Sequence, residues 1–339
     1  MLVRDRIDAQ GLESLMPLTH ATALVGETPR LSGPGPHRCS DLCDWVGLSF
    51  ELPPGDPRLL AIHDGAPAPT PPLDNLVGAV KYWHEHPDWM TLLDPASPAH
   101  HDKLVERALY LDFWRDHLPS AGDRVLDLGG GVGRFMDWLL DRDCTVELVD
   151  PDLRSLWRAV TSAAGKSGAL DVHWSTGERM PELEPVDCAV ACEVLCYVED
   201  PLQVLQNIRR SLKPGAPLLF SVEARWGWAM GPDVHEGTIG DFFGDGIVHV
   251  PGDRWVRTFE PDDIAELLEL AGFEIVTLQP SHYAMSGPFE MAAGELTIEQ
   301  ALQLEERLRS HPVARGLNRA WMVVARVRDD LDAVRPTQP

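Results

Sequence analysis

The stretch that decides the fold of this 339-residue chain is VLDLGGGVGRF, residues 125–135. An apolar run containing Asp127 leads into glycines at positions 129, 131 and 133, and an amphipathic run follows. A strand that turns directly into a helix needs glycine at the turn, where a Cβ is not tolerated. The N-terminus of the helix beyond offers unpaired N–H groups to a ligand. The stretch therefore predicts a strand, a turn that binds a nucleotide cofactor, and a helix.

The spacing of the glycines indicates which cofactor binds. A dinucleotide-binding turn reads G-x-G-x-x-G, but the sixth position counted from Gly129 is Arg134. The pattern is instead Asp-x-Gly-x-Gly-x-Gly, which resembles motif I of the class I S-adenosylmethionine-dependent methyltransferases. The resemblance implies an α/β, doubly wound, Rossmann-like sheet of seven strands that binds S-adenosylmethionine and releases S-adenosylhomocysteine. It places these residues at the cofactor: Asp127, Gly129, Gly131 and Gly133.

Two later segments continue the resemblance. The run VELVD, residues 146–150, ends in Asp150. In a βαβ unit such an acid accepts hydrogen bonds from both ribose hydroxyls, although it could instead cap the next helix. The segment STGERMP, residues 175–181, stands where the family binds adenine, and many members carry an aspartate there that this chain lacks. In the absence of that aspartate, we expect the adenine to be contacted by Thr176 or Glu178, or by the backbone of this segment, which includes Gly177.

The segment VDCAVACEVLCYV, residues 186–198, resembles the family's fourth strand and the loop after it. This resemblance implies that Cys192 and Glu193 lie beside the methionine end of the cofactor. The remaining strands are expected at residues 217–222, 274–278 and 321–327, with a helix over 259–273. In all, the resemblance covers about residues 103–327.

The chain divides into three parts. Residues 1–100 do not match the family core and are rich in proline and glycine, so we expect an N-terminal extension that caps the site. Residues 101–330 form the predicted methyltransferase domain, with lid insertions at 224–258 and 279–319. Residues 331–339 are a tail.

The two insertions have different compositions. The insertion at 224–258 leaves the fifth strand at its carboxyl end, where ligands of α/β sheets bind. Its tryptophans, phenylalanines and histidines suit an apolar or aromatic small molecule, although packing within the lid explains most of them equally well. In the insertion at 279–319 the pattern predicts a helix over 297–310, with Thr297 as its N-cap and Gln300 completing a capping box.

Composition narrows the class of protein. The chain has 29 Lys and Arg against 53 Asp and Glu, a net charge of −24, which argues against nucleic acid and anionic membranes as partners. No apolar run is long enough to span a bilayer, and residues 1–16 lack the apolar centre of a secretory signal. We therefore expect a cytoplasmic protein with reduced cysteines.

The sequence does not predict a metal centre. His37, Cys39 and Cys43 stand close together, and His63 is a conceivable fourth ligand. A structural zinc site usually shows two well-spaced pairs of ligands, whereas this segment has one loosely spaced pair. Packing by reduced cysteines is the favoured interpretation.

The expected chemistry requires little of the protein beyond alignment. A methyl group on a sulfonium is electrophilic, so the main task is to hold the acceptor in line with the S–CH₃ bond. A general base is needed only where the acceptor carries a proton of high pKa. The first candidates are His235 and Tyr197, and packing is an alternative role for either. Further candidates are His249, His282 and Tyr283.

The sequence thus predicts an enzyme that methylates a small, apolar or aromatic-containing metabolite by in-line displacement. The acceptor atom and the oligomeric state stay open, a homodimer included. The same fold also fits an enzyme that binds S-adenosylmethionine without methylating, such as a decarboxylase, a cyclase or a rearrangement catalyst. A regulatory or scaffold protein without activity is another alternative, and Arg134 disfavours an NAD-dependent oxidoreductase.

Overall fold

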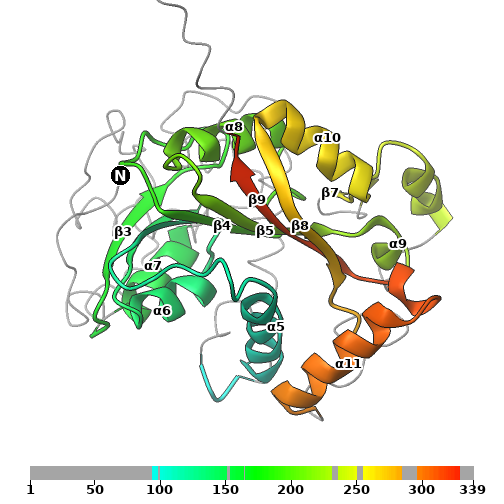
Figure 1. The fold of residues 1–339 in the computed structure, drawn as a ribbon, viewed down its shortest axis with the longest axis horizontal. Coiled ribbons are helices and arrows are strands. Elements are labelled where there is room, and N and C mark those ends of the chain that lie inside the picture. Colours follow the sequence, from blue (N-terminus) through cyan, green and yellow to red (C-terminus); the bar gives the residue numbers. More distant parts are fainter. Residues whose placement is uncertain are drawn as a thin grey trace, which may run out of the picture.

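The computed structural model describes residues 94–97, 100–150, 153–163, 165–230, 236–249, 255–284 and 296–328 (Figure 1). The predicted N-terminal cap lies outside these residues except for its last positions, and the predicted tail lies outside them entirely. Five residues singled out in the sequence also fall outside: His37, Cys39, Cys43, His63 and His235.

A mixed sheet of seven strands lies at the centre of the fold, in the order β3-β2-β1-β4-β5-β9-β8. The strands are β1 (Arg124–Leu128), β2 (Thr145–Asp150), β3 (Ala169–Trp174), β4 (Cys188–Cys192), β5 (Pro217–Glu223), β8 (Phe273–Ser281) and β9 (Ala320–Val327). The first five pair in parallel, and β9 runs antiparallel between β5 and β8. The doubly wound, seven-stranded sheet that the sequence predicts is confirmed.

The strand order reverses beside β1, and this reversal fixes where a ligand can bind. β2 and β3 lie on one side of β1, while β4 and β5 lie on the other. Ligands of doubly wound sheets bind beyond the carboxyl ends of the strands at such a point. Because β9 is antiparallel to both of its neighbours, β8 runs parallel to β5. The carboxyl ends of β1, β2, β4, β5 and β8 therefore share one edge of the sheet.

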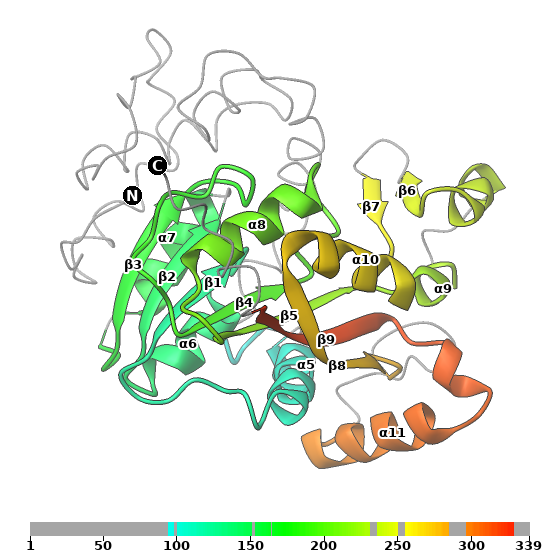
Figure 2. The same ribbon diagram turned by 45° about the horizontal axis from the view of Figure 1, so that its top comes forward.

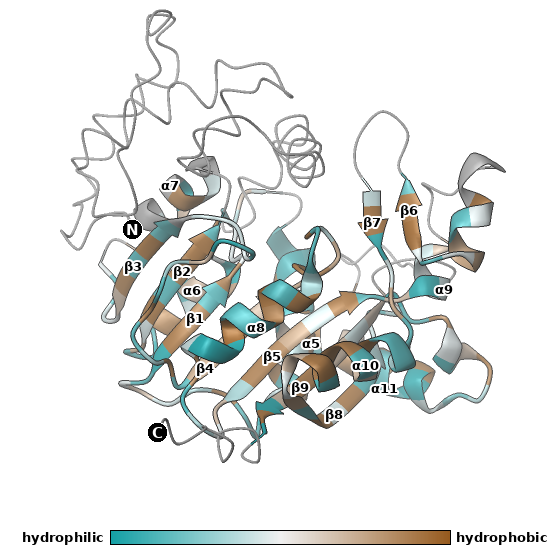
Figure 3. Ribbon diagram, turned by 90° about the horizontal axis from the view of Figure 1, so that it is seen from above, coloured by the Kyte–Doolittle hydropathy of each residue, from teal (hydrophilic) through white to brown (hydrophobic). Residues whose placement is uncertain are grey.

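Helices cover both faces of the sheet (Figures 1 and 2). One face carries α5 (His100–Phe113), α6 (Arg134–Leu140) and α7 (Leu153–Ser162), and the other carries α8 (Pro201–Ser211) and α10 (Pro261–Ala271). Neighbouring residues of one strand serve opposite faces, since Val125 packs with the first group and Leu126 with the second. The inner strands are accordingly apolar along most of their length (Figure 3).

The insertion at 224–258 contains regular structure of its own. It holds α9 (Arg225–Trp228), the 3₁₀ helix η4 (Glu236–Phe243) and an antiparallel pair, β6 (Ile247–His249) with β7 (Trp255–Arg257). Val248 and Val256 face each other in this pair and are buried. The sequence did not predict these strands, because three residues are too few to establish an alternating pattern.

The last two strands differ slightly from their predicted bounds. β8 continues to Ser281, so the predicted insertion at 279–319 begins inside a strand. After it, α11 (Ile298–Ser310) begins as predicted. Thr297 Oγ1 accepts from the Gln300 N–H at 3.2 Å, and Gln300 Oε1 accepts from the Thr297 N–H at 2.8 Å. The predicted capping box is confirmed. Among the residues described, no helix combines the length and the apolar character needed to cross a membrane.

One buried carboxylate ties α11 to the end of β8. Glu305 is completely buried, and its Oε1 accepts from the Ala284 N–H at 2.9 Å. Its Oε2 is 3.5 Å from the Ser281 hydroxyl, which donates to it. Glu305 thereby fixes the chain just after β8, where His282 also lies.

We expect Glu305→Ala to lower the free energy of unfolding by about 1–3 kcal/mol, because the buried Ala284 N–H loses its acceptor. Glu305→Gln keeps an oxygen at that position and should retain most of the stability. Glu306→Ala is the matched control, because Glu306 is an exposed neighbour on the same helix, and it should cost less than about 0.5 kcal/mol. Urea unfolding of the three variants measures this, and equal losses at positions 305 and 306 would contradict the assignment.

Candidate functional site

The glycine turn has the geometry predicted for it. β1 ends at Leu128, and α6 begins at Arg134. Gly129, Gly131 and Gly133 have φ angles of +65°, +57° and +97°, which is the left-handed region that only glycine enters without strain. The Gly129 N–H donates to the carbonyl of Val149 at 2.7 Å, so the turn rests against the end of β2.

The glycines of this turn serve different purposes. A Cβ on Gly129 would lie 2.4 Å from Val194 Cγ2, and a Cβ on Gly130 would lie 2.6 Å from a carboxylate oxygen of Asp127. Packing within the chain accounts for both. A Cβ on Gly131 would meet nothing within 4 Å. Gly131 is thus the position of this turn where half-buried backbone borders open space, as the approach of a ligand requires.

Two acids flank the turn in different ways. Asp127 is buried below it, and its Oδ2 accepts from the Met136 N–H at 3.1 Å, which fixes the start of α6. Burial raises the pKa of Asp127 to about 7, against the opposing effect of Arg134. Asp150 ends β2, and its Oδ2 accepts from the Gly131 N–H at 2.9 Å. Asp150 is therefore the acid that stands beside the open space.

The segment after β3 brings one unsatisfied group to the same region. Thr176 is buried, and its hydroxyl has no hydrogen-bond partner. Leaving such a group unpaired costs stability, which a ligand with a donor or acceptor would relieve. The neighbours are already engaged: the carbonyls of Gly177 and Glu178 accept from Asn207, and Glu178 Oε1 accepts from the Glu199 N–H. The open space at Gly131 and the unpaired hydroxyl of Thr176 fit a bound S-adenosylmethionine.

The tip of β4 is held by a hydroxyl network. Glu193 directly follows the strand with φ +59°, a strained value for a residue other than glycine. Its N–H donates to Ser221 Oγ at 3.1 Å, and its Oε1 accepts from the Tyr110 hydroxyl at 3.4 Å. Tyr110 and Ser221 also share a hydrogen bond of 2.9 Å. Cys192 precedes Glu193 as a half-buried free thiol, so the two residues predicted at the methionine end do lie at this edge of the sheet.

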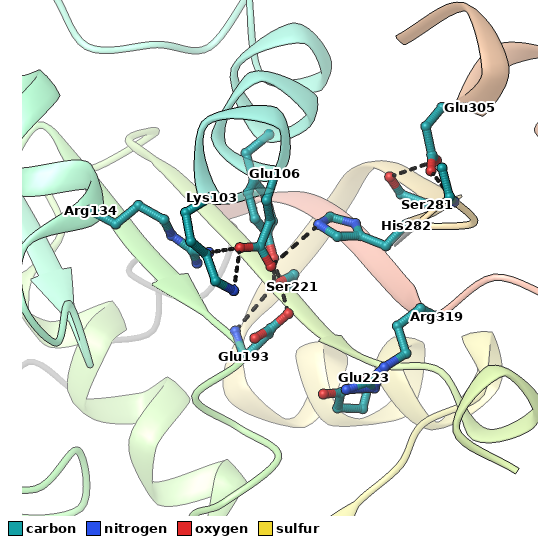
Figure 4. Close-up of polar contacts among 12 residues, drawn as sticks. Lys103, Glu106, Arg134, Glu193, Ser221, Glu223, Ser281, His282, Glu305 and Arg319 are labelled. Carbon is teal, nitrogen blue, oxygen red and sulfur yellow. Dashed lines mark hydrogen bonds and ion pairs between the residues drawn. The ribbon is translucent and has the colours of Figure 1, made fainter. Parts of the chain in front are cut away.

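A buried ion pair joins α5 to the glycine turn (Figure 4). Arg134 binds Glu106 Oε2, and Lys103 Nζ lies 2.8 Å from the same oxygen. Burial alone would raise the pKa of Glu106, but Arg134 and Lys103 outweigh it and hold that pKa below its usual range. The Arg134 guanidinium also lies 5.3 Å from the ring centroid of Tyr110. These α5 residues were not predicted from the sequence, although Glu106 and Tyr110 stand four positions apart and therefore on one helix face.

A second buried pair stands at the end of β5. Arg319 binds Glu223 Oε2, while Glu223 Oε1 is buried without a hydrogen-bond partner. Burial raises the pKa of Glu223 to about 7, against the effect of Arg319. Ala320 on β9 pairs with Glu223 on β5 and, on its other side, with Ser281 on β8. These three residues therefore form a row across the sheet, perpendicular to the strands.

His282 follows this row and is buried, and it faces Glu106 (Figure 4). Neither ring nitrogen makes a hydrogen bond.

The other candidate bases lie elsewhere. Tyr197 is half-buried in the turn after β4, close enough to Arg319 for their charges to interact. His249 is exposed, with Nδ1 3.4 Å from Asp241 Oδ2. The Tyr283 hydroxyl donates to the carbonyl of Arg315 at 2.8 Å, a structural contact. No group of three potential ligands of a metal ion occurs within the described part of the chain.

Comparison with known proteins identifies related sequences. A family model described as a methyltransferase domain matches residues 86–278, more than half of the chain. The ubiquinone biosynthesis O-methyltransferase of Paracidovorax citrulli is 34% identical over 113 residues, 32% of this chain and 47% of that protein. The tRNA 5-carboxymethoxyuridine methyltransferase of Escherichia coli is 32% identical over 164 residues, 45% of this chain and 60% of that protein. The chain thus spans about half the length of the curated relatives it matches.

Among solved structures, the 1,6-didemethyltoxoflavin-N1-methyltransferase of Burkholderia thailandensis, with 1,6-didemethyltoxoflavin and S-adenosylhomocysteine bound, is similar at 18% identity. The likeness covers 78% of this chain and 93% of that one, with a TM-score of 0.48.

The buried carboxyl of Asp127 predicts a pH dependence of stability. Because its pKa rises from 3.8 to about 7, the folded chain keeps a proton that the unfolded chain releases. Its stabilising contribution is complete at low pH and is lost as the pH rises through this window, by at most about 1.4 kcal/mol per pH unit. Asp127→Asn keeps an acceptor for the Met136 N–H and abolishes the titration.

The variant should therefore gain stability relative to the wild type as the pH rises from about 4 to about 7. Urea unfolding of both proteins at matched pH values measures the difference. A difference that stays constant with pH would show that Asp127 is ionised throughout.

Proposed function

We propose, since the chain belongs to the methyltransferase domain family, that it transfers the methyl group of S-adenosylmethionine to a small, apolar or aromatic-containing metabolite. The single observation that carries the proposal is Gly131, whose left-handed backbone borders open space and whose N–H meets Asp150. When bound, S-adenosylmethionine supplies an electrophilic methyl group on a positively charged sulfur.

Different residues around the turn contact different parts of the cofactor. Asp150 accepts hydrogen bonds from the ribose hydroxyls, and Thr176 meets the adenine. Cys192 and Glu193 border the methionine end. Asp127 contributes indirectly, because it holds α6 and the glycine turn in place from below.

The acceptor lies beyond the tips of β4, β5 and β8. The carboxylate of Glu193 at the tip of β4 repels phosphates, and the net charge of −24 opposes binding to nucleic acid. A small, neutral metabolite is the class of acceptor that suits this edge. We further propose that the insertion at 224–258 and the N-terminal cap close over it, with His235 and Tyr197 within reach, and that the enzyme acts in the cytoplasm without a membrane or nucleic-acid partner.

Activity is tested by incubating the full chain with S-adenosylmethionine and a panel of neutral phenols, catechols, alcohols and amines. Mass spectrometry should detect S-adenosylhomocysteine together with one methylated compound. Conversion of a panel compound without S-adenosylhomocysteine would favour a non-methylating enzyme of this fold. Cofactor binding with no conversion of any compound would favour a regulatory or scaffold protein.

The cofactor site is tested by Gly131→Val, which puts a side chain into the open space. We expect the affinity for S-adenosylmethionine to fall at least about 100-fold, a loss of about 2.7 kcal/mol. Gly215→Val is the matched control, because Gly215 also has a positive φ, +72°, and open space around its would-be Cβ, in an exposed turn. Calorimetry that finds equal affinities for the two variants would remove Gly131 from the site.

A further inference from the structure

The residue that the proposed function leaves unexplained is His282. It follows β8 with φ +63°, a left-handed conformation that is strained for histidine. It is 2% exposed, and both ring nitrogens lack hydrogen-bond partners. A buried imidazole that satisfies neither nitrogen costs stability, and backbone strain of this kind persists where it orients a functional side chain. The position therefore calls for a ligand that completes the hydrogen bonding.

The surroundings of His282 resemble those of a general base. Its Nε2 lies 4.0 Å from Glu106 Oε1, the carboxylate oxygen that Arg134 and Lys103 leave free. Its ring centroid lies 4.9 Å from that of Tyr110, whose hydroxyl holds the tips of β4 and β5. A carboxylate on one side of an imidazole selects the tautomer and stabilises the imidazolium that forms on protonation.

We propose, on the basis of the proposed function, that His282 is the base that takes the proton from a neutral hydroxyl or N–H acceptor, with Glu106 as its positioning residue. The nucleophilic atom of the acceptor bonds to the methyl carbon, and the pair of the breaking S–C bond stays on sulfur. The acceptor's proton goes to His282 Nδ1, while the Nε2–H faces Glu106. Charges and atoms balance, and no further reactant is needed.

The charged groups around His282 agree with this role. Glu106 and Tyr110 face it from α5, Arg134 from the start of α6, Glu193 from the tip of β4 and Glu305 from α11. Burial lowers the pKa of His282 below its usual 6.5 and outweighs Glu106, the largest opposing charge. The imidazole is therefore neutral at physiological pH, which is the state that accepts a proton.

The same groups restrict the acceptor. Three carboxylates, Glu106, Glu193 and Glu305, act on His282, and they disfavour an anionic substrate. An acceptor that is already ionised needs no base. The proposal therefore specifies a protic group that stays neutral in solution, such as a phenol or an alcohol, and it excludes carboxylates as acceptors.

The test uses His282→Gly, because glycine suits the left-handed backbone and leaves room for added imidazole. The probe is the panel compound that gives the fastest formation of S-adenosylhomocysteine with the wild type. We expect kcat to fall at least about 100-fold, with KM and the affinity for S-adenosylmethionine within about threefold. Added imidazole should restore activity, and the acid limb of the pH profile, where wild-type kcat falls as His282 becomes protonated, should disappear.

The matched control is His173→Gln. His173 is equally buried, but it lies on the edge strand β3, which β2 and β1 separate from β4, and its Nε2 is 2.6 Å from Glu147 Oε2. The His173→Gln variant should keep the pH profile of the wild type and its response to added imidazole. If His282→Gly does not fold, His282→Asn serves instead, because asparagine tolerates a left-handed backbone and cannot accept a proton near neutrality.

A readout independent of turnover comes from ¹⁵N-labelled histidine in the full chain, with His282 assigned by its loss in His282→Asn. Its ring should be neutral at pH 7, and Glu106→Gln should lower its pKa further because an anion is removed. A protonated ring at pH 7, or a kcat within about threefold of wild type in His282→Gly or His282→Asn, overturns the proposal. If the wild type forms no S-adenosylhomocysteine with any compound, the proposed methyl transfer fails instead, and the two failures are distinct.

Discussion

The buried contact between Arg134 and Glu106 is the interaction on which the site depends. Arg134 is the first residue of α6, directly after the glycine turn, and Glu106 lies on α5, which packs against the same face of the sheet. Removing one member of a buried pair leaves the other charge uncompensated and typically costs about 3–5 kcal/mol. The contact therefore fixes the position of α5 relative to the turn, and with it every residue that α5 presents.

Helix α5 connects the two halves of the site. Glu106 Oε2 reaches the glycine turn through Arg134, whereas Glu106 Oε1 faces His282. Next along the same helix face, Tyr110 holds Ser221 and Glu193 at the tips of β5 and β4. The proposed cofactor side and the proposed acceptor side thus meet at one helix. A shift of α5 would therefore disturb the cofactor side and the acceptor side at the same time. The buried contacts around α5 oppose such a shift.

Much of the fold could be read from the sequence because its signals are local. A glycine turn, an acid at a strand end and apolar runs of strand length each involve neighbouring residues, and they predicted the strand–turn–helix at 125–135. The seven-stranded sheet followed from the family resemblance that these motifs carry. The capping box of Thr297 and Gln300 was predicted for the same reason. The short pair β6 and β7 was missed, since three residues carry no usable pattern.

The site could be read only in part. The spacing of the motifs predicted that Asp150 lies beside the glycine turn. It did not distinguish Gly131, which borders open space, from Gly129, which is packed against Val194. That distinction depends on a contact between segments far apart in the sequence. The buried group of Glu106, Arg134 and His282 likewise joins three segments that are far apart in the sequence. No local pattern in one segment predicts that it contacts the other two.

The electrostatics of the strand tips follow from how each carboxyl is paired. Glu106 has two cations on one oxygen, so it stays ionised although it is buried. Glu223 has a single cation, Arg319, as its partner, so the effect of burial prevails and its pKa rises to about 7. A permanent anion on α5, beside His282, thus accompanies a carboxyl at the tip of β5 that can be neutral. Groups whose environments push their pKa values in opposite directions are the arrangement that proton transfer at neutral pH requires.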